Sequence, residues 1–177
     1  MPPLNPNPDS FETDSFPLPP WSSSGTNRTV WSVDSEMAYK GTRSLRSPSF
    51  GGRSTPASSN AMLVIDQAYG GGILSFQVIA SVSPPHDLFT VYIDGEVAGQ
   101  STMVEEWEEQ SFELQPGRHV VEFSYRWNLI GPQLLPPRMT TATGAVWLDV
   151  VEVRELDARG RLFQRRKPAQ TRKNLSA

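Results

Sequence analysis

The sequence predicts an all-β protein, a sandwich or jelly roll of about eight to ten short strands with irregular segments at both ends. Short runs in which apolar and polar residues alternate recur along the chain, as expected for strands with one buried face. Turn-forming residues separate these runs, and the 177 residues include 16 prolines and 13 glycines. No stretch shows a helical pattern. An open sheet of this size would expose its edges, so a closed arrangement is expected.

The clearest strand lies at residues 89–94 and ends in a tight turn. Its apolar residues Phe89, Val91 and Ile93 alternate with polar neighbours that include Tyr92. Successive side chains of a strand point to opposite faces, so we expect these three in the core and Tyr92 at the surface or in a groove. The Asp-Gly pair that follows is typical of a two-residue hairpin turn, which returns the chain antiparallel to itself.

Further segments show strand patterns, at residues 10–12, 30–33, 44–47, 61–65, 73–82, 107–114, 119–127 and 145–154. Between them, Trp21 is expected in a Pro- and Ser-rich loop, and residues 48–60 in a mobile surface loop. The segment 128–143 is expected to be a long loop, and long ordered loops in compact domains are often functional. The tryptophans in mid-strand are expected in the core, namely Trp31, Trp107 and Trp147.

The chain divides into a leader, a domain and a tail. Residues 1–8 are Pro-rich and can neither propagate a helix nor join a central strand, because proline lacks an amide donor. Residues 9–155 form the predicted sandwich domain. Residues 156–177 form a tail, expected to be disordered, whose positive charges lie at Arg159, Arg161, Arg165, Arg166, Lys167, Arg172 and Lys173. Such a tail can contact an anionic partner, and the favoured alternative is a linker to another domain.

Composition excludes several classes of function. The chain has no cysteine, which rules out disulfides and thiolate metal sites. A net charge of -3 argues against a general polyanion binder, so the folded domain is not expected to bind nucleic acid. No apolar run approaches the roughly 18 to 20 residues of a membrane span, and the first residues lack the basic and apolar parts of a signal peptide.

The order of the segments resembles a known kind of module. The colinear series consists of Ser10-Phe11-Glu12, Trp31, Gly41 with Ser44-Leu45-Arg46, Gly72 to Phe76, Asp87 to Gly95, Trp107, Gly117-Arg118-His119, Phe123-Ser124-Tyr125 and Trp147-Leu148-Asp149. Over residues 9–154 it resembles the concanavalin-like jelly-roll β-sandwich modules of the MAM and cleaved-adhesin type. The resemblance implies two antiparallel sheets in an extracellular or cell-surface module. It also implies adhesion, or binding of glycans or proteins, rather than catalysis.

Many modules of this kind hold a structural calcium near the start of the domain. Carried over to this sequence, the resemblance makes Glu12 and Asp149 candidate ligands, with backbone oxygens around Gly41 to Ser44 completing an oxygen cage. The sequence departs from the family pattern at Val150, where a second aspartate is common, and one carboxylate fewer lowers the expected affinity. The alternative is that Glu12 and Asp149 accept hydrogen bonds from backbone amides at strand ends.

No set of residues predicts catalysis, and we expect the protein not to be an enzyme. His86 lies in a Pro-rich loop and is expected to be a solvated turn residue. His119 begins a strand after a tight turn and is expected to make structural hydrogen bonds. No serine stands in a Gly-x-Ser-x-Gly motif. The glutamates flanking Trp107 fit a solvated acidic strand edge better than a carboxylate pair for glycoside hydrolysis.

Aromatic side chains are the candidate ligand-binding residues, because sugar-binding modules use exposed aromatic faces as platforms. Tyr92, Tyr125 and Trp127 are expected to line the open face of one sheet, and with Arg126 nearby they form a shallow site. The leading hypothesis is a non-catalytic module that recognises a glycan or a protein surface, with calcium bracing its terminal strands. The alternative is a structural subunit of a larger surface, particle or appendage assembly, whose leader and tail reach neighbouring subunits.

Overall fold

A computed structural model describes residues 11–13, 15–50, 56–65, 71–82, 87–101, 103–127 and 144–156. In these ranges the chain forms ten strands and one short 3₁₀ turn. The elements are β1 (Trp21–Gly25), η1 (Thr26–Arg28), β2 (Ser32–Asp34), β3 (Ser44–Arg46), β4 (Ala57–Ile65), β5 (Gly72–Ser81), β6 (Asp87–Ile93), β7 (Glu96–Ser101), β8 (Val104–Leu114), β9 (His119–Trp127) and β10 (Ala145–Glu155). The predicted all-β class is confirmed.

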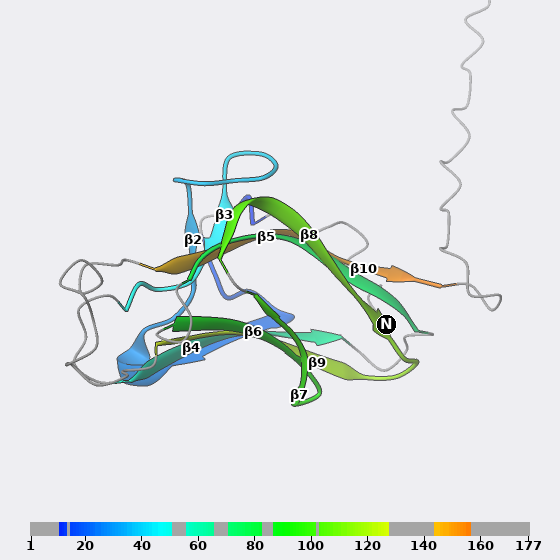
Figure 1. Cartoon of the computed structure of the whole chain (residues 1–177). Coiled ribbons are helices and arrows are strands. Elements are labelled where there is room, and N and C mark those ends of the chain that lie inside the picture. The colour runs from blue at the N-terminus through cyan, green and yellow to red at the C-terminus, as the bar shows by residue number, and fades with distance from the viewer. Residues whose placement is uncertain are drawn as a thin grey trace, which may run out of the picture.

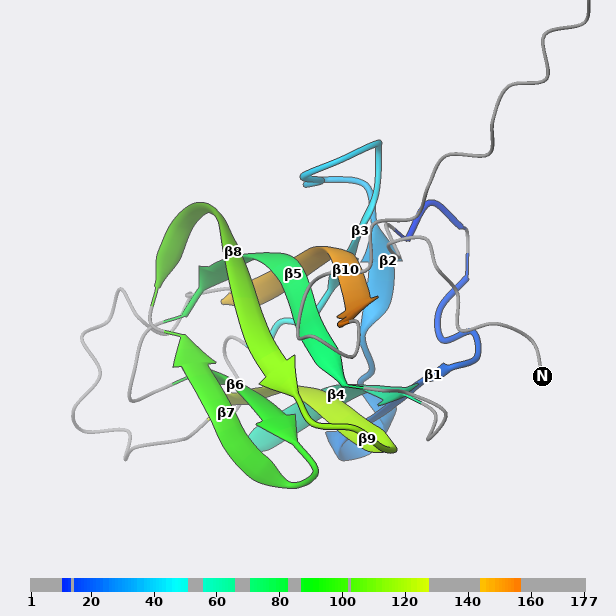
Figure 2. The same ribbon diagram turned by 90° about the vertical axis from the view of Figure 1, so that its right-hand side faces the viewer.

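The strands form two five-stranded sheets. The first sheet has the order β1-β4-β9-β6-β7 and the second sheet has the order β2-β3-β10-β5-β8. Neighbouring strands run antiparallel in both sheets. Figures 1 and 2 show the two sheets stacked as layers, with β8 and β5 of one layer above β6, β7 and β9 of the other. This is the two-sheet antiparallel sandwich that the sequence predicts.

The core lies between the two layers. Phe76 of β5 meets Phe123 of β9 edge to face, with ring centroids 5.1 Å apart. Phe89 and Val91 of β6 are 0% and 1% exposed, and Ile93 packs against the same cluster. The predicted core face of this strand is therefore confirmed. Burial of an aromatic or branched side chain of this size contributes about 1.5–3 kcal/mol to folding.

The predicted hairpin turn joins β6 to β7. Asp94 and Gly95 have φ values of 53° and 86°, the positive values that a type I′ turn requires. Asp94 also ties the turn to β9, because its Oδ1 accepts a hydrogen bond of 2.8 Å from the Val120 amide. Its Oδ2 lies 2.7 Å from Nδ1 of His119, whose Nε2 lies 2.6 Å from the Gln115 carbonyl oxygen. His119 is thus a structural hydrogen-bonding residue, as predicted.

The first part of the sandwich differs from the sequence prediction. Phe11 and Glu12 form no strand, and Phe11 adopts a φ of 55° and packs against Trp21 with ring centroids 5.5 Å apart. Trp21 is buried at the start of β1 rather than in a loop, because β1 pairs with β4. β4 begins at Ala57, so the end of the predicted surface loop is strand. Serine-rich segments usually form loops, so the sequence analysis predicted neither β1 nor the start of β4 as strand.

The prediction that Trp147 lies in the core is wrong. Val146 and Leu148, both 0% exposed, take the inward positions of β10, so the side chain between them points outward. The half-buried Trp147 donates its Nε1–H to Oδ2 of Asp34 at 2.8 Å. The guanidinium carbon of Arg46 lies 5.3 Å from the centre of the Trp147 ring. The indole is therefore held on the outer face of the second sheet by a carboxylate and a cation.

Trp107 is also only half-buried, which corrects its predicted core position, whereas Trp31 is fully buried as predicted. Trp107 meets the exposed Tyr39 edge to face, with ring centroids 6.0 Å apart. The leader at 1–8, the predicted loop at 128–143, His86 and the tail from residue 157 lie outside the described residues. In the described part of the chain, no helix has the length and apolar character needed to cross a membrane.

Candidate ligand-binding groove

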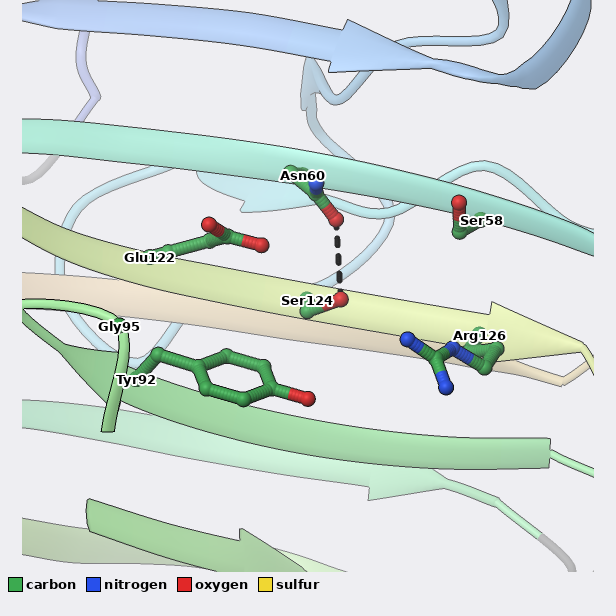
Figure 3. A pocket seen from close by; sticks show the side chains of 7 residues that line it. All are labelled: Ser58, Asn60, Tyr92, Gly95, Glu122, Ser124 and Arg126. Carbon is green, nitrogen blue, oxygen red and sulfur yellow. Dashed lines mark hydrogen bonds between the residues drawn. The ribbon is translucent and has the colours of Figure 1, made fainter. Parts of the chain in front are cut away.

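A shallow hollow lies on the outer face of the first sheet. Its volume is about 210 Å³. Strands β4, β6 and β9 and the hairpin turn contribute its lining, which consists of Ser58, Asn60, Tyr92, Gly95, Glu122, Ser124 and Arg126 (Figure 3). On β4 and β9 these positions alternate with buried residues, so their side chains point away from the core. We call this hollow the groove.

The sheet register places one uncharged polar side chain from every strand in a single row across the first sheet. The row consists of Ser24, Asn60, Ser124, Thr90 and Gln100. Ser124 donates its hydroxyl to Oδ1 of Asn60 at 2.9 Å, and Gln100 donates its Nε2–H to Oγ1 of Thr90 at 3.5 Å. At a strand spacing of about 4.8 Å, the row spans about 19 Å. Such side chains donate and accept, which suits a ligand rich in hydroxyl groups.

Two charged side chains of β9 mark the ends of the groove. Arg126 stands opposite Ser58 of β4, and Glu122 stands opposite Tyr92 of β6. The side chain of Arg126 is exposed, whereas that of Glu122 is half-buried. Four residues of extended strand place the two positions about 13 Å apart. The groove is therefore polarised, with a carboxylate at one end and a guanidinium at the other.

Tyr92 supplies the aromatic ring of the groove lining. Figure 3 shows this ring extending from beside Gly95 toward Arg126, whose guanidinium points back into the hollow. A bulge lies next to it, because the register of β6 with β7 shifts between Val91 and Tyr92. Bulges re-aim neighbouring side chains. The space beside Gly95 is open, since a Cβ built there meets no atom within 4 Å.

The structure separates the residues that the sequence analysis grouped as a ligand site. Tyr92 and Arg126 line the groove. The prediction that Tyr125 and Trp127 lie on the same open face is wrong, because these side chains are only 0% and 4% exposed. Both alternate with Arg126 along β9 and therefore share the inward face of Phe123. The two side chains serve the core and are not available as a platform.

Sequence reasoning missed the polar part of the groove. Ser58 and Asn60 fall in a segment predicted as a loop, and their strand becomes evident only through its pairing with β9. Glu122 and Ser124 lie on the outward face of a correctly predicted strand. The period-2 alternation along residues 119–127 was the signal that could have selected them, since it places both on the face of Arg126.

A second polar site surrounds Glu12. Its Oε1 accepts hydrogen bonds from the backbone amides of Thr42 at 2.9 Å and Arg43 at 3.1 Å, and its Oε2 accepts the Thr42 hydroxyl at 2.9 Å. The hydrogen bonds from Thr42 lower the pKa of the Glu12 carboxyl. Gly41 lies against this carboxylate with a φ of 78°, and a Cβ there would stand 2.1 Å from Oε1. The positive φ strains any residue with a side chain here, and a Cβ would also displace the Glu12 carboxylate from its hydrogen bonds, so glycine is favoured at this position.

Glu12 holds one end of the segment 39–43, and Asp149 accepts hydrogen bonds from the other end. Oδ2 of Asp149 accepts hydrogen bonds from the backbone amides of Tyr39 at 2.9 Å and Lys40 at 2.8 Å, and its Oδ1 accepts that of Val150 at 2.7 Å. The side chain is fully buried. Burial raises the pKa of Asp149 despite these hydrogen bonds, and the negative charge of Glu12 raises it further. The two carboxylates are thus close enough to repel each other.

The fit of this pair to a cation can be judged from its hydrogen bonds. The described residues contain no group of three or more His, Cys, Asp or Glu side chains that could hold a metal ion. The backbone groups that contact Glu12 and Asp149 are amides, as the alternative to calcium predicts. Each carboxylate nevertheless keeps one oxygen that accepts a single hydrogen bond, Oε2 of Glu12 and Oδ1 of Asp149. These two oxygens retain lone pairs for a hard cation.

The acidic cluster of β8 forms a strand edge. Glu105, Glu106, Glu108 and Glu109 are exposed, and Trp107 between them is half-buried. β8 ends the order of the second sheet, so its outer edge has no neighbouring strand among the described elements. Glutamates on such an edge discourage pairing with another chain. This arrangement agrees with a solvated edge rather than with a pair of catalytic carboxylates facing each other across a cleft.

Comparisons with known proteins give similarity in structure alone, since no protein-family model and no curated protein sequence matches the chain. The chain is similar to TmCBM61, solved in complex with β-1,4-galactotriose, with a TM-score of 0.56 and 14% identity over 83% of this chain and 94% of that chain. It is also similar to the K3 cleaved adhesin domain of Lys-gingipain from Porphyromonas gingivalis W83. That TM-score is 0.59, with 15% identity over 81% of this chain and 95% of that chain.

A third similar structure is the CBM22-1 xylan-binding domain of Xyn10C from Paenibacillus barcinonensis. The TM-score is 0.51, with 15% identity over 85% of this chain and 93% of that chain. At these identities the likeness establishes the fold. The chain thus shares the β-sandwich fold of carbohydrate-binding modules and cleaved adhesin domains.

Proposed function

We propose that the protein is a non-catalytic binding module whose groove takes a carbohydrate chain. The observation that carries this proposal is the ring of Tyr92 standing beside a row of uncharged, hydrogen-bonding side chains. A pyranose has an apolar face and a rim of hydroxyl groups. It is therefore recognised by an aromatic ring together with groups that both donate and accept hydrogen bonds.

In this proposal the carbohydrate lies in the groove along β9, between Glu122 and Arg126, and crosses the polar row at Asn60 and Ser124. Ser124 and Thr90 are 5% and 3% exposed and form the floor of the row, where they orient their neighbours. Asn60 is half-buried and lines the groove, so it can contact the ligand directly, while the exposed Ser24 and Gln100 extend the row on either side. The distance of about 13 Å between the Cα positions of Glu122 and Arg126 accommodates a short oligosaccharide.

The structural similarities support this proposal. Two of the similar structures are described by the carbohydrate that they bind, and a third is an adhesin domain. On the basis of these similarities, we propose that this chain lies outside the cell or on its surface. We also propose that it is a module of the MAM and cleaved-adhesin type. A protein surface is the other ligand class that adhesin domains suggest, and the groove residues are the contacts that we assign to either ligand.

The experiment is a glycan array followed by calorimetry on the best ligand. Tyr92→Ala is expected to lower affinity at least tenfold, because it removes the aromatic platform. The matched control is Tyr39→Ala, which removes an exposed tyrosine that packs on Trp107 of the second sheet. Binding that survives Tyr92→Ala, or that is lost equally in both variants, would contradict the assignment of the groove.

Light scattering on the same sample separates this function from the alternative. A monomer that binds sugar supports the binding module. Ordered oligomers that bind no glycan would instead identify a structural subunit of a larger surface, particle or appendage assembly.

We further propose that calcium binds between Glu12 and Asp149 and braces the start and the end of the domain. Three features support it: the mutual repulsion of the two carboxylates, the burial of Asp149, and the oxygens Oε2 of Glu12 and Oδ1 of Asp149, which accept one hydrogen bond each. A divalent cation would relieve this repulsion and would link β10 to residues 12 and 39–43.

A further inference from the structure

We propose that the groove selects a glycan that carries an isolated acidic sugar, whose carboxylate binds Arg126. This inference rests on the proposed function, because it names the ligand class of the same groove. Neutral sugars occupy Tyr92 and the polar row, and the acidic sugar lies at the end of the groove formed by Arg126 and Ser58.

Arg126 has the features of a carboxylate-binding residue. Its side chain is exposed, and among the described residues it is not one of the ion-paired side chains. Figure 3 shows the guanidinium turned toward the hollow rather than away from the sheet. A guanidinium presents a planar fork of donors that matches a carboxylate in two parallel hydrogen bonds.

The hydroxyl of Ser58 stands on the strand next to Arg126, in the same register pair. It is half-buried and lies on the groove face of β4. A hydroxyl beside a guanidinium can donate to a carboxylate oxygen or accept from a sugar hydroxyl. The two side chains together form a site that takes an acid attached to a hydroxyl-rich ring.

Glu122 limits how much negative charge the ligand can carry. Glu122 and Arg126 are four positions apart on β9, about 13 Å between their Cα positions, and they form no ion pair with each other among the described residues. Each charge therefore acts most strongly on the sugar that lies nearest to it. A chain with an acid on every sugar would place one carboxylate against Glu122, whereas a chain with one acid avoids that repulsion.

The test compares three kinds of oligosaccharide on the same backbone, chosen by glycan array: neutral, with one uronic acid, and with a uronic acid on every sugar. Calorimetry at low and at physiological salt measures each affinity. We expect the singly acidic ligand to bind about tenfold more tightly than the neutral one, with a preference that shrinks as salt rises. Arg126→Gln is expected to remove this preference, so that the neutral and the singly acidic ligand bind the variant with equal affinity.

Two further variants complete the test. Arg118→Gln removes an exposed arginine that immediately precedes β9, at the end of the strand away from Arg126, and is expected to leave the preference intact. Glu122→Gln is expected to raise affinity for the uniformly acidic ligand severalfold. Equal binding of neutral and singly acidic ligands, or a preference that survives Arg126→Gln, would overturn this inference and leave the proposed function standing. Tightest binding of the uniformly acidic ligand to the unaltered protein would overturn the role of Glu122. No binding to any glycan would overturn the proposed function itself.

Discussion

The hydroxyl group of Tyr125 donates a hydrogen bond of 2.9 Å to Oδ2 of Asp87, and both side chains are buried in the sandwich. The Tyr125 ring also stacks on Phe50, with ring centroids 5.5 Å apart and planes inclined by 7°. Gly144 closes the pair from one side, since a Cβ there would lie 2.2 Å from the carboxylate and 2.6 Å from the hydroxyl. Burial raises the pKa of Tyr125, so this phenol is a permanent donor.

Tyr125→Phe is expected to lower the free energy of unfolding by about 1–3 kcal/mol, because it deprives the buried Asp87 of a hydrogen bond. Urea denaturation measures the change. Tyr92→Phe is the matched control: Tyr92 is only half-buried, and loss of its hydroxyl is expected to change the free energy of unfolding by less than about 0.5 kcal/mol. Glycan affinity is expected to be unchanged in Tyr125→Phe, and a loss of affinity with intact stability would place this tyrosine back among the ligand contacts.

Asp94 and His119 make the stability of the hairpin depend on pH. Burial lowers the pKa of His119, but the Gln115 carbonyl and the Asp94 carboxylate outweigh it and raise the pKa overall. Stabilisation from His119 is therefore complete below its unfolded pKa of about 6.5 and is lost as pH rises through the folded pKa. Burial raises the pKa of Asp94, but hydrogen bonds from Val120 and His119 lower it overall. Its contribution is present above about pH 3.9 and is lost as pH falls through the folded pKa.

The pair is thus expected to stabilise the protein most between about pH 4 and 6.5. Asp94→Asn keeps an acceptor for the Val120 amide and tolerates the positive φ of the turn, so it tests the charge alone. We expect this variant to flatten the fall in stability above pH 6.5. Titration of the imidazole protons by NMR measures the His119 pKa directly, and a value below 6.5 would contradict the expected sign.

The calcium proposal predicts that millimolar calcium raises the melting temperature and that a chelator reverses the rise, because a ligand that binds only the native state stabilises it. Asp149→Ala is expected to abolish the calcium effect, and it also lowers stability because three backbone amides lose their acceptor. Glu12→Gln keeps an acceptor for Thr42 and Arg43 and is expected to weaken the response without that loss. An unchanged melting temperature with calcium and with chelator would refute the site.

Asn60 offers a test of the polar row that does not involve the aromatic platform. Asn60→Ala removes the acceptor of the Ser124 hydroxyl and one amide that faces the ligand. We expect affinity for the bound glycan to fall about threefold to tenfold, in line with one or two lost hydrogen bonds. Ser22→Ala is the matched control, because Ser22 is exposed on β1 and pairs with Met62 outside the row. Equal effects of the two substitutions would argue against the row.

The fold could be predicted from the sequence wherever apolar and polar residues alternate strictly. Residues 89–94 and 119–127 show that alternation, and both are strands with the expected turns beside them. β1 and the start of β4 consist largely of serine, which carries no hydrophobic pattern. Their strand conformation depends on pairing with each other and with β9, a long-range contact that local sequence does not encode.

The candidate site was predictable in part for the same reason. Tyr92 and Arg126 follow from alternation within single strands. Tyr125 and Trp127 were assigned to the wrong face, because aromatic character was given more weight than their shared parity with Phe123. Asn60 belongs to the groove only because β4 pairs with β9 in a particular register, and that register is a property of the folded sheet.

The alternation that builds the groove also separates two kinds of evolutionary change. On β9 the side chains that form the groove take every second position, and those that form the core take the positions between. Outward substitutions on such a strand usually change stability by less than about 0.5 kcal/mol, whereas inward ones cost several times more. Ligand preference in this sandwich can therefore drift through single substitutions on one face while the scaffold stays constant, so that related chains with the same fold can diverge in what they bind.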